Sequence, residues 1–108
     1  MNIEFYKPGC KDFFKKYARQ EAVIKEKIKA AIIKENNMGM TKVKLACKER
    51  INGQPIYEFR LNVGKIGSIR IAFTVFDNQV AVYFITTKLQ KSVFSQEFSK
   101  IVNSIPKN

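Results

Sequence analysis

The chain has 108 residues, enough for one domain with a single hydrophobic core. Its hydrophobic share of 45% and charged share of 27% are ordinary for a globular protein and exclude a wholly disordered chain. The 20 lysines and arginines outnumber the nine aspartates and glutamates, and the formal net charge of +11 favours a polyanionic partner over a simple solubility effect.

Residues that commonly form metal and cofactor sites are scarce. Histidine is absent, and the two cysteines, Cys10 and Cys47, lack metal-binding spacing. We therefore expect no metal site, no cofactor and no disulfide framework. The first nine residues lack the pattern of a signal peptide, and no apolar run approaches a membrane span. These features predict a cytoplasmic protein with reduced thiols and no membrane partner.

The N-terminal part changes from strand to helical periodicity. Residues 2–6 alternate apolar and polar side chains, which predicts a short strand that Lys7, Pro8 and Gly9 end. A helical pattern begins at Lys11, and a second helix is predicted over residues 21–35, where apolar residues recur at helical spacing. The segment Asn36-Asn37-Met38-Gly39 is typical of a helix C-terminus. The two helical stretches form either a hairpin or one bent helix.

After Gly39 the apolar period changes to two, the period of strands. Residues 42–46 and 56–61 alternate, and Asn52-Gly53 between them is a turn signal. Residues 69–76 and 80–87 are longer apolar strands joined by a tight turn.

Helical periodicity returns from Val93, with Ser92 as a possible N-cap and an apolar stripe that begins at Phe94. The sequence therefore predicts a single α+β domain over residues 1–108. Its N-terminal helices pack on one face of a small, mostly antiparallel sheet, and a C-terminal helix follows.

Side chains alternate between the two faces of a strand, so the charged strand residues can be assigned to a face. Ile56, Glu58 and Arg60 share one face of their strand, and Arg70 lies on the corresponding face of the next. The opposite faces are wholly apolar and should take the helices. We therefore expect Glu58, Arg60 and Arg70 on a face that is open or only partly covered, where Arg70 matters more for activity than for folding.

Four cations are the candidate catalytic residues. A guanidinium group binds phosphate oxygens in a bidentate manner, and two such groups can stabilise the extra charge of a phosphorane. RNA can be cleaved without a metal when its own 2′-hydroxyl attacks the adjacent phosphate, so cations, positioning and proton transfer are what an enzyme must supply. The candidates are Arg60, Arg70, Lys88 and Lys91.

Further residues are candidates for substrate binding. Lys42, Lys44, Lys48 and Arg50 lie beside the sheet and are suited to contact a nucleic-acid backbone, whereas the lysines of the helices are a solvated face. Glu58 could act as a base, but we expect it to hold an arginine. The alternative without a function is a cross-strand pair of Glu58 with one arginine, which stabilises by at most about 1 kcal/mol.

The order of these segments resembles the RelE/HigB family of bacterial toxins. The resemblance is carried by Tyr57-Glu58-Phe59-Arg60, by the SIRIAF segment 68–73, and by Phe84 followed by the KLQKS segment 88–92. It covers about residues 42 to 105. It implies a RelE-like α+β fold and a type II toxin–antitoxin toxin. RelE and HigB members cleave mRNA in the ribosomal A site, and a cognate antitoxin protein encoded beside the toxin silences each one.

The resemblance implies roles for individual residues. Arg60 falls on the basic strand position, Arg70 on the central arginine, and Lys88 and Lys91 on the basic turn. Phe94 stands where RelE-like toxins have a tyrosine. It cannot transfer a proton, so we expect it to stack against a nucleotide, with a place in the core as the alternative. The general base is left unassigned.

Two other functions stay open at this point. One is a toxin of the related ParE type, which resembles RelE in fold but binds DNA gyrase without catalysis. The other is a basic nucleic-acid-binding module without toxicity. The basic strand and turn favour the ribosome-dependent mRNA endoribonuclease, while the missing tyrosine and histidine leave room for the ParE type.

Overall fold

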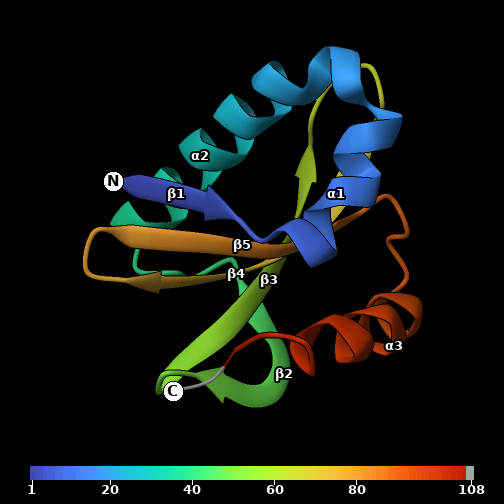
Figure 1. Cartoon of the computed structure of the whole chain (residues 1–108). Coiled ribbons are helices and arrows are strands. Elements are labelled where there is room, and N and C mark those ends of the chain that lie inside the picture. Colours follow the sequence, from blue (N-terminus) through green and yellow to red (C-terminus); the bar gives the residue numbers. More distant parts are fainter. Residues whose placement is uncertain (107–108) are drawn as a thin grey trace.

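The computed structural model describes residues 1–106, which form five strands and three α-helices (Figure 1). A 3-10 turn at Ala18–Gln20 joins the first two helices. The predicted α+β class, with N-terminal helices, a mostly antiparallel sheet and a C-terminal helix, is confirmed. The elements in chain order are β1 Asn2–Phe5, α1 Lys7–Lys16, α2 Glu21–Asn37, β2 Lys44–Ile51, β3 Gln54–Asn62, β4 Ser68–Phe76, β5 Gln79–Thr86 and α3 Lys91–Val102.

The five strands form one sheet in the order β1-β5-β4-β3-β2. Strand β1 is parallel to β5, and the other neighbours are antiparallel. The predicted turn at Asn52-Gly53 joins β2 to β3, and both residues have the positive φ (51° and 79°) that a two-residue hairpin turn favours. Hairpins therefore fix the order of β2 to β5.

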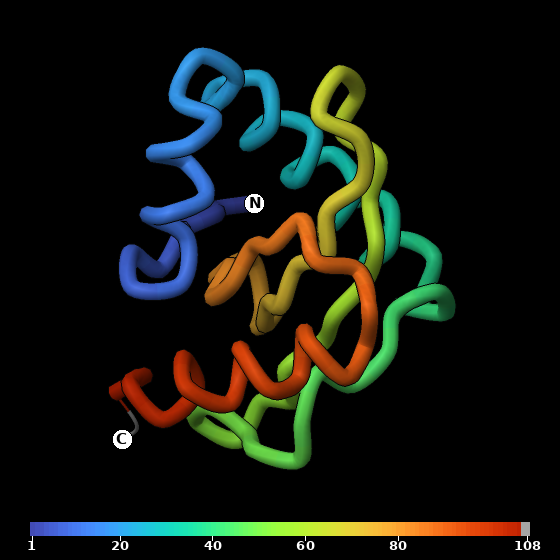
Figure 2. The backbone as a smooth tube through the Cα atoms, turned by 90° about the vertical axis from the view of Figure 1, so that its right-hand side faces the viewer, coloured from blue at the N-terminus to red at the C-terminus, as the bar shows by residue number. Residues whose placement is uncertain are grey.

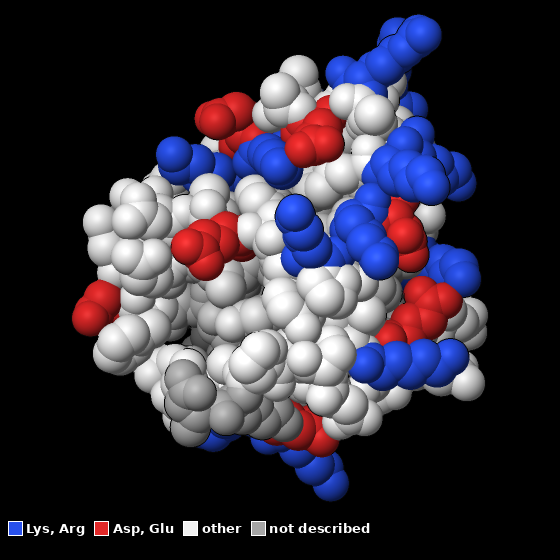
Figure 3. Space-filling model, viewed as in Figure 1, with Lys and Arg blue, Asp and Glu red and all other residues white. Residues whose placement is uncertain are grey.

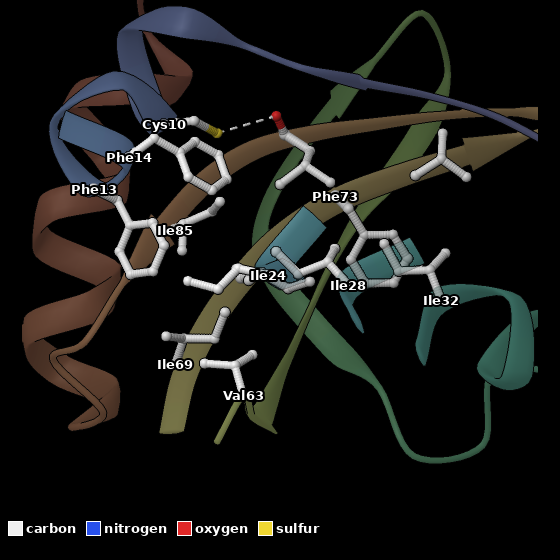
Figure 4. Close-up of a cluster of buried hydrophobic side chains, with 13 residues drawn as sticks. Cys10, Phe13, Phe14, Ile24, Ile28, Ile32, Val63, Ile69, Phe73 and Ile85 are labelled. Atoms are coloured by element: carbon white, nitrogen blue, oxygen red, sulfur yellow. Dashed lines mark hydrogen bonds between the residues drawn. The ribbon is translucent and has the colours of Figure 1, made fainter. Parts of the chain in front are cut away.

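Helices cover both faces of the sheet (Figures 1 and 2). Helices α1 and α2 bury Phe13, Phe14, Ile24, Ile28 and Ile32 against the wholly apolar face (Figure 4).

Helix α3 covers part of the other face, where Phe94, Phe98 and Val102 pack against Ile56, Ala72 and Phe84. Helix α3 therefore covers only part of the face that carries Glu58, Arg60 and Arg70, and the covered part ends next to these residues.

Two helix starts differ from the sequence prediction. Helix α1 begins at Lys7 rather than at Lys11, and Pro8 lies in its first turn, where the missing N–H breaks no intrahelical bond. Helix α3 begins at Lys91, so Ser92 lies inside it; the N-cap residue is Gln90, whose side chain makes no capping hydrogen bond. The predicted Ser92 cap is wrong.

Cys10 is a buried thiol on α1, and its Sγ donates to the carbonyl oxygen of Val82 at 3.5 Å (Figure 4). Burial raises the pKa of Cys10 from 9.0 to about 12, because a thiolate there would lose its hydration. At pH 8 we expect iodoacetamide to modify the half-buried Cys47 long before Cys10, as peptide mass spectrometry would show. Equal modification rates in the native protein would contradict this, and equal rates in urea are the control.

Candidate functional site

A basic hollow of about 560 Å³ opens where the end of α2, the start of β2 and the middle of β3 and β4 meet the beginning of α3. Six of the side chains that line this basic hollow are cationic and two are carboxylates. The excess positive charge in a concave site attracts anions. The charged lining residues are Lys34, Lys42, Lys44, Arg60, Arg70 and Lys91, with Glu35 and Glu58.

Arg60 and Arg70 are direct cross-strand partners in the register of β3 and β4. Like charges in opposing positions destabilise a sheet, so this pairing needs a compensating anion. Arg70 has one, since its guanidinium donates to Glu58 Oε2 at 3.2 Å. Arg60 is exposed, and no carboxylate within residues 1–106 forms a salt bridge with it. Arg60 is thus the cation of this pair that is available to a ligand.

Glu58 connects two cations beneath the opening. Its side chain is 3% exposed, and Lys91 Nζ donates to the same Oε2 atom that accepts from Arg70. Lys91 Nζ also donates to the carbonyl oxygen of Leu45 at 3.3 Å. The carboxylate therefore ties β4 to the start of α3 and orients both cations, as expected for a residue that holds an arginine.

Phe94 lies under the two cations that Glu58 holds. Its ring centroid is 5.7 Å from the guanidinium carbon of Arg70 and 5.5 Å from Lys91 Nζ, which is within cation–π range. The residue is 0% exposed and packs against Phe84 and Phe98. Stacking of Phe94 on a nucleotide is therefore wrong, and the core alternative is the observed arrangement. The apolar stripe that begins at Phe94 in the sequence also indicates a place in the core for this residue.

Besides Phe94, three predicted cationic residues lie outside the basic hollow. Lys88 forms a salt bridge with Glu97 of α3 at 2.7 Å. Lys48 and Arg50 are exposed further along β2, where the β2–β3 register is irregular between Leu45 and Arg50. Arg50 donates to the carbonyl oxygen of Gly53 at 3.0 Å. The structure thus brings together six predicted residues, Lys42, Lys44, Glu58, Arg60, Arg70 and Lys91.

Two charged residues of the basic hollow were not predicted. Lys34 and Glu35 come from the last turns of α2, which the sequence gives no reason to place beside β3. Glu35 is 7% exposed, and its Oε1 accepts the backbone N–H of Lys42 at 3.2 Å. This bond anchors the segment between α2 and β2. It positions Lys42 and Lys44 at the rim.

The charge is also uneven over the rest of the surface. Figure 3 shows lysine and arginine side chains gathered around α1 and sparse around the β4–β5 hairpin.

Comparison with known proteins found no relative. No protein-family model, curated protein or solved structure matches the chain. Over residues 1–106, no helix has both the length and the apolar character needed to cross a bilayer. The same part of the chain has no cluster of three or more cysteine, aspartate or glutamate side chains able to hold a metal ion.

Proposed function

We propose that the chain is a type II toxin of the RelE/HigB class, a cytoplasmic, ribosome-dependent endoribonuclease that cleaves mRNA and blocks translation. The observation that carries the proposal is Arg60, an arginine without a salt bridge among residues 1–106 that lies directly opposite Arg70 in a basic hollow. A phosphate bound there would supply the anion that Arg60 lacks, since Arg70 is already paired with Glu58. The order of the strand and turn motifs supports the same class.

The proposed reaction uses the RNA as its own nucleophile. The 2′-hydroxyl oxygen loses its proton as it attacks the adjacent phosphorus, and the bond from phosphorus to the 5′-oxygen breaks. The 5′-oxygen takes up a proton in return, so the products are a 2′,3′-cyclic phosphate and a 5′-hydroxyl. Arg60 and Arg70, the latter oriented by Glu58, would bind the phosphate and stabilise the charge of the phosphorane. Lys44 and Lys91 would contact flanking phosphates at the rim.

The partners follow from the same proposal. The ribosome would present the mRNA, and the cognate antitoxin would silence the toxin. The basic hollow suits an acidic antitoxin segment, because six cations outnumber two carboxylates there.

One observation favours a second candidate, a ParE-like toxin that binds DNA gyrase without catalysis. Neither histidine nor tyrosine lines the basic hollow, so the aromatic and imidazole groups that commonly transfer protons are missing from it. The two candidates differ in what induced expression does to cells. An endoribonuclease creates new mRNA ends, whereas a gyrase inhibitor changes plasmid supercoiling.

Arg60→Gln is expected to abolish growth arrest on induced expression, since losing a transition-state cation lowers cleavage by about 10²–10³-fold. Arg50→Gln is the matched control, an exposed arginine of the neighbouring strand outside the basic hollow, and it should arrest growth as wild type does. Mapped mRNA ends and plasmid supercoiling are measured in the same cells. Full arrest by Arg60→Gln would remove Arg60 from the site, and lost supercoiling without new mRNA ends would favour the gyrase-binding class.

A further inference from the structure

A second hollow of about 200 Å³ lies where the junction of α1 and α2 faces the loop between β3 and β4. Three exposed cations, Arg19, Lys27 and Lys65, line this distal hollow, and no carboxylate of residues 1–106 is among its lining residues. Lys27 Nζ donates to the carbonyl oxygen of Val63 at 3.2 Å, which connects α2 to the loop. The distal hollow is therefore a concave site of purely positive charge that the proposed reaction does not use.

The two hollows are bounded by the same two segments. Helix α2 contributes Val23 and Lys27 to the distal hollow and Lys34 to the basic hollow. Strand β3 contributes residues 58–61 to the basic hollow, and the loop after it contributes Val63, Lys65 and Ile66 to the distal hollow. Figures 1 and 2 show the 63–67 loop beside the α1–α2 junction. The hollows are thus arranged in sequence along α2 and β3, with α2 rising about 17 Å from Val23 to Lys34.

Cations repeated along one path select a ligand whose negative charges are also repeated. A nucleic-acid strand carries one phosphate per nucleotide, and a stacked strand advances about 3.4 Å per phosphate. The path along α2 would then take at most about five nucleotides. A single strand can enter concave sites, whereas a duplex offers its convex outer surface, so single-stranded RNA fits this surface better.

We propose that the distal hollow is a second phosphate-binding subsite, and that one single strand of RNA runs from the basic hollow to the distal hollow. The proposal rests on the proposed function, which makes RNA the ligand. Arg19, Lys27 and Lys65 bind phosphates several nucleotides from the Arg60–Arg70 pair. They act on affinity and register and not on the cleavage step.

The test compares two double variants that remove the same charge. Arg19→Gln/Lys65→Gln changes the distal hollow, and Lys11→Gln/Lys100→Gln removes two exposed lysines from other surfaces. Binding of labelled oligouridylates of three and eight nucleotides is measured between 50 and 200 mM salt. We expect the first variant to lose roughly tenfold in affinity for the octanucleotide, with a salt slope lower by about 1.4, since each phosphate contact on a single strand contributes about 0.7. Its affinity for the trinucleotide should stay at the wild-type value.

Equal losses in the two double variants would overturn the subsite, because only net charge would then matter. Equal affinity for an octanucleotide duplex would overturn the single-strand path. Cleavage of ribosome-bound mRNA is assayed separately. If Arg19→Gln/Lys65→Gln cleaves mRNA normally and binds the octanucleotide as wild type does, the subsite is rejected and the proposed function is not. Length-dependent binding that this variant weakens would support the subsite even if wild type cleaved no mRNA, an outcome that would reject the proposed function alone.

Discussion

Glu58→Ala is expected to lower the free energy of unfolding by about 3–5 kcal/mol, the range for breaking a buried ion pair from one side. The loss arises mainly at Arg70, whose side chain is only 16% exposed and would keep its charge without a partner. Within residues 1–106, Arg70 Nε already has no hydrogen-bond partner, so the site has little capacity to compensate. Urea denaturation monitored by circular dichroism measures the change.

Glu97→Ala is the matched control, because Glu97 pairs with Lys88 in a more exposed salt bridge. Exposed pairs contribute at most about 1 kcal/mol, so this variant should remain near wild type. Similar losses for Glu58→Ala and Glu97→Ala would contradict a buried, structural role for Glu58.

Arg70 also has a structural role through its contact with Glu58. The sequence suggested that Arg70 matters more for activity than for folding, but Arg70→Ala would leave the buried Glu58 carboxylate with only the half-exposed Lys91 as partner. Loss of activity in Arg70→Ala would then mix unfolding with lost chemistry. Arg60 is exposed and forms no salt bridge in the described part of the chain, so it is the cleaner probe of function.

Gly9→Ala is expected to destabilise the fold by about 3 kcal/mol or more, the upper part of the range for overpacking. A Cβ atom at Gly9 would lie 1.7 Å from the carbonyl oxygen and 2.8 Å from the carbonyl carbon of Tyr83, so α1 would have to move away from β5. For a domain of this size the midpoint of thermal unfolding should fall by more than about 10 °C.

Gly39→Ala separates this clash from backbone strain. Gly39 has a φ of +77° and no atom within 4 Å of the added Cβ, so the cost there comes from the backbone alone, about 1 kcal/mol. Equal losses in the free energy of unfolding for Gly9→Ala and Gly39→Ala would contradict a costly clash at Gly9, since α1 would then move away from β5 with little loss of stability.

Local periodicity predicted most of the fold because hairpins and amphipathic helices are set by neighbouring residues. The strands, the Asn52-Gly53 turn and helix α2 follow from such patterns. The start of α1 does not, because Pro8-Gly9 has the composition of a turn. Its helical state depends on a close approach to Tyr83, on a strand more than 70 residues later in the chain.

The part of the candidate site that could be predicted is the part set by the alternation of side chains along the strands. Alternation placed Glu58, Arg60 and Arg70 on one face, and the β3–β4 register brings them together. Lys34 and Glu35 line the basic hollow because of where α2 ends over the sheet, and the local sequence does not determine that position. Lys88 lies outside the basic hollow and forms a salt bridge with Glu97 in the second turn of α3, a pairing that strand alternation does not predict.

The most direct test of the proposed function is cleavage of a defined mRNA on programmed ribosomes by the purified protein. We expect new mRNA ends within the A-site codon, with a 2′,3′-cyclic phosphate on the upstream fragment. Arg60→Gln should cleave about 10²–10³-fold more slowly, while Arg50→Gln should cleave at the wild-type rate. Absence of cleavage by the folded wild-type protein, or equal rates for wild type and Arg60→Gln, would contradict the proposed function.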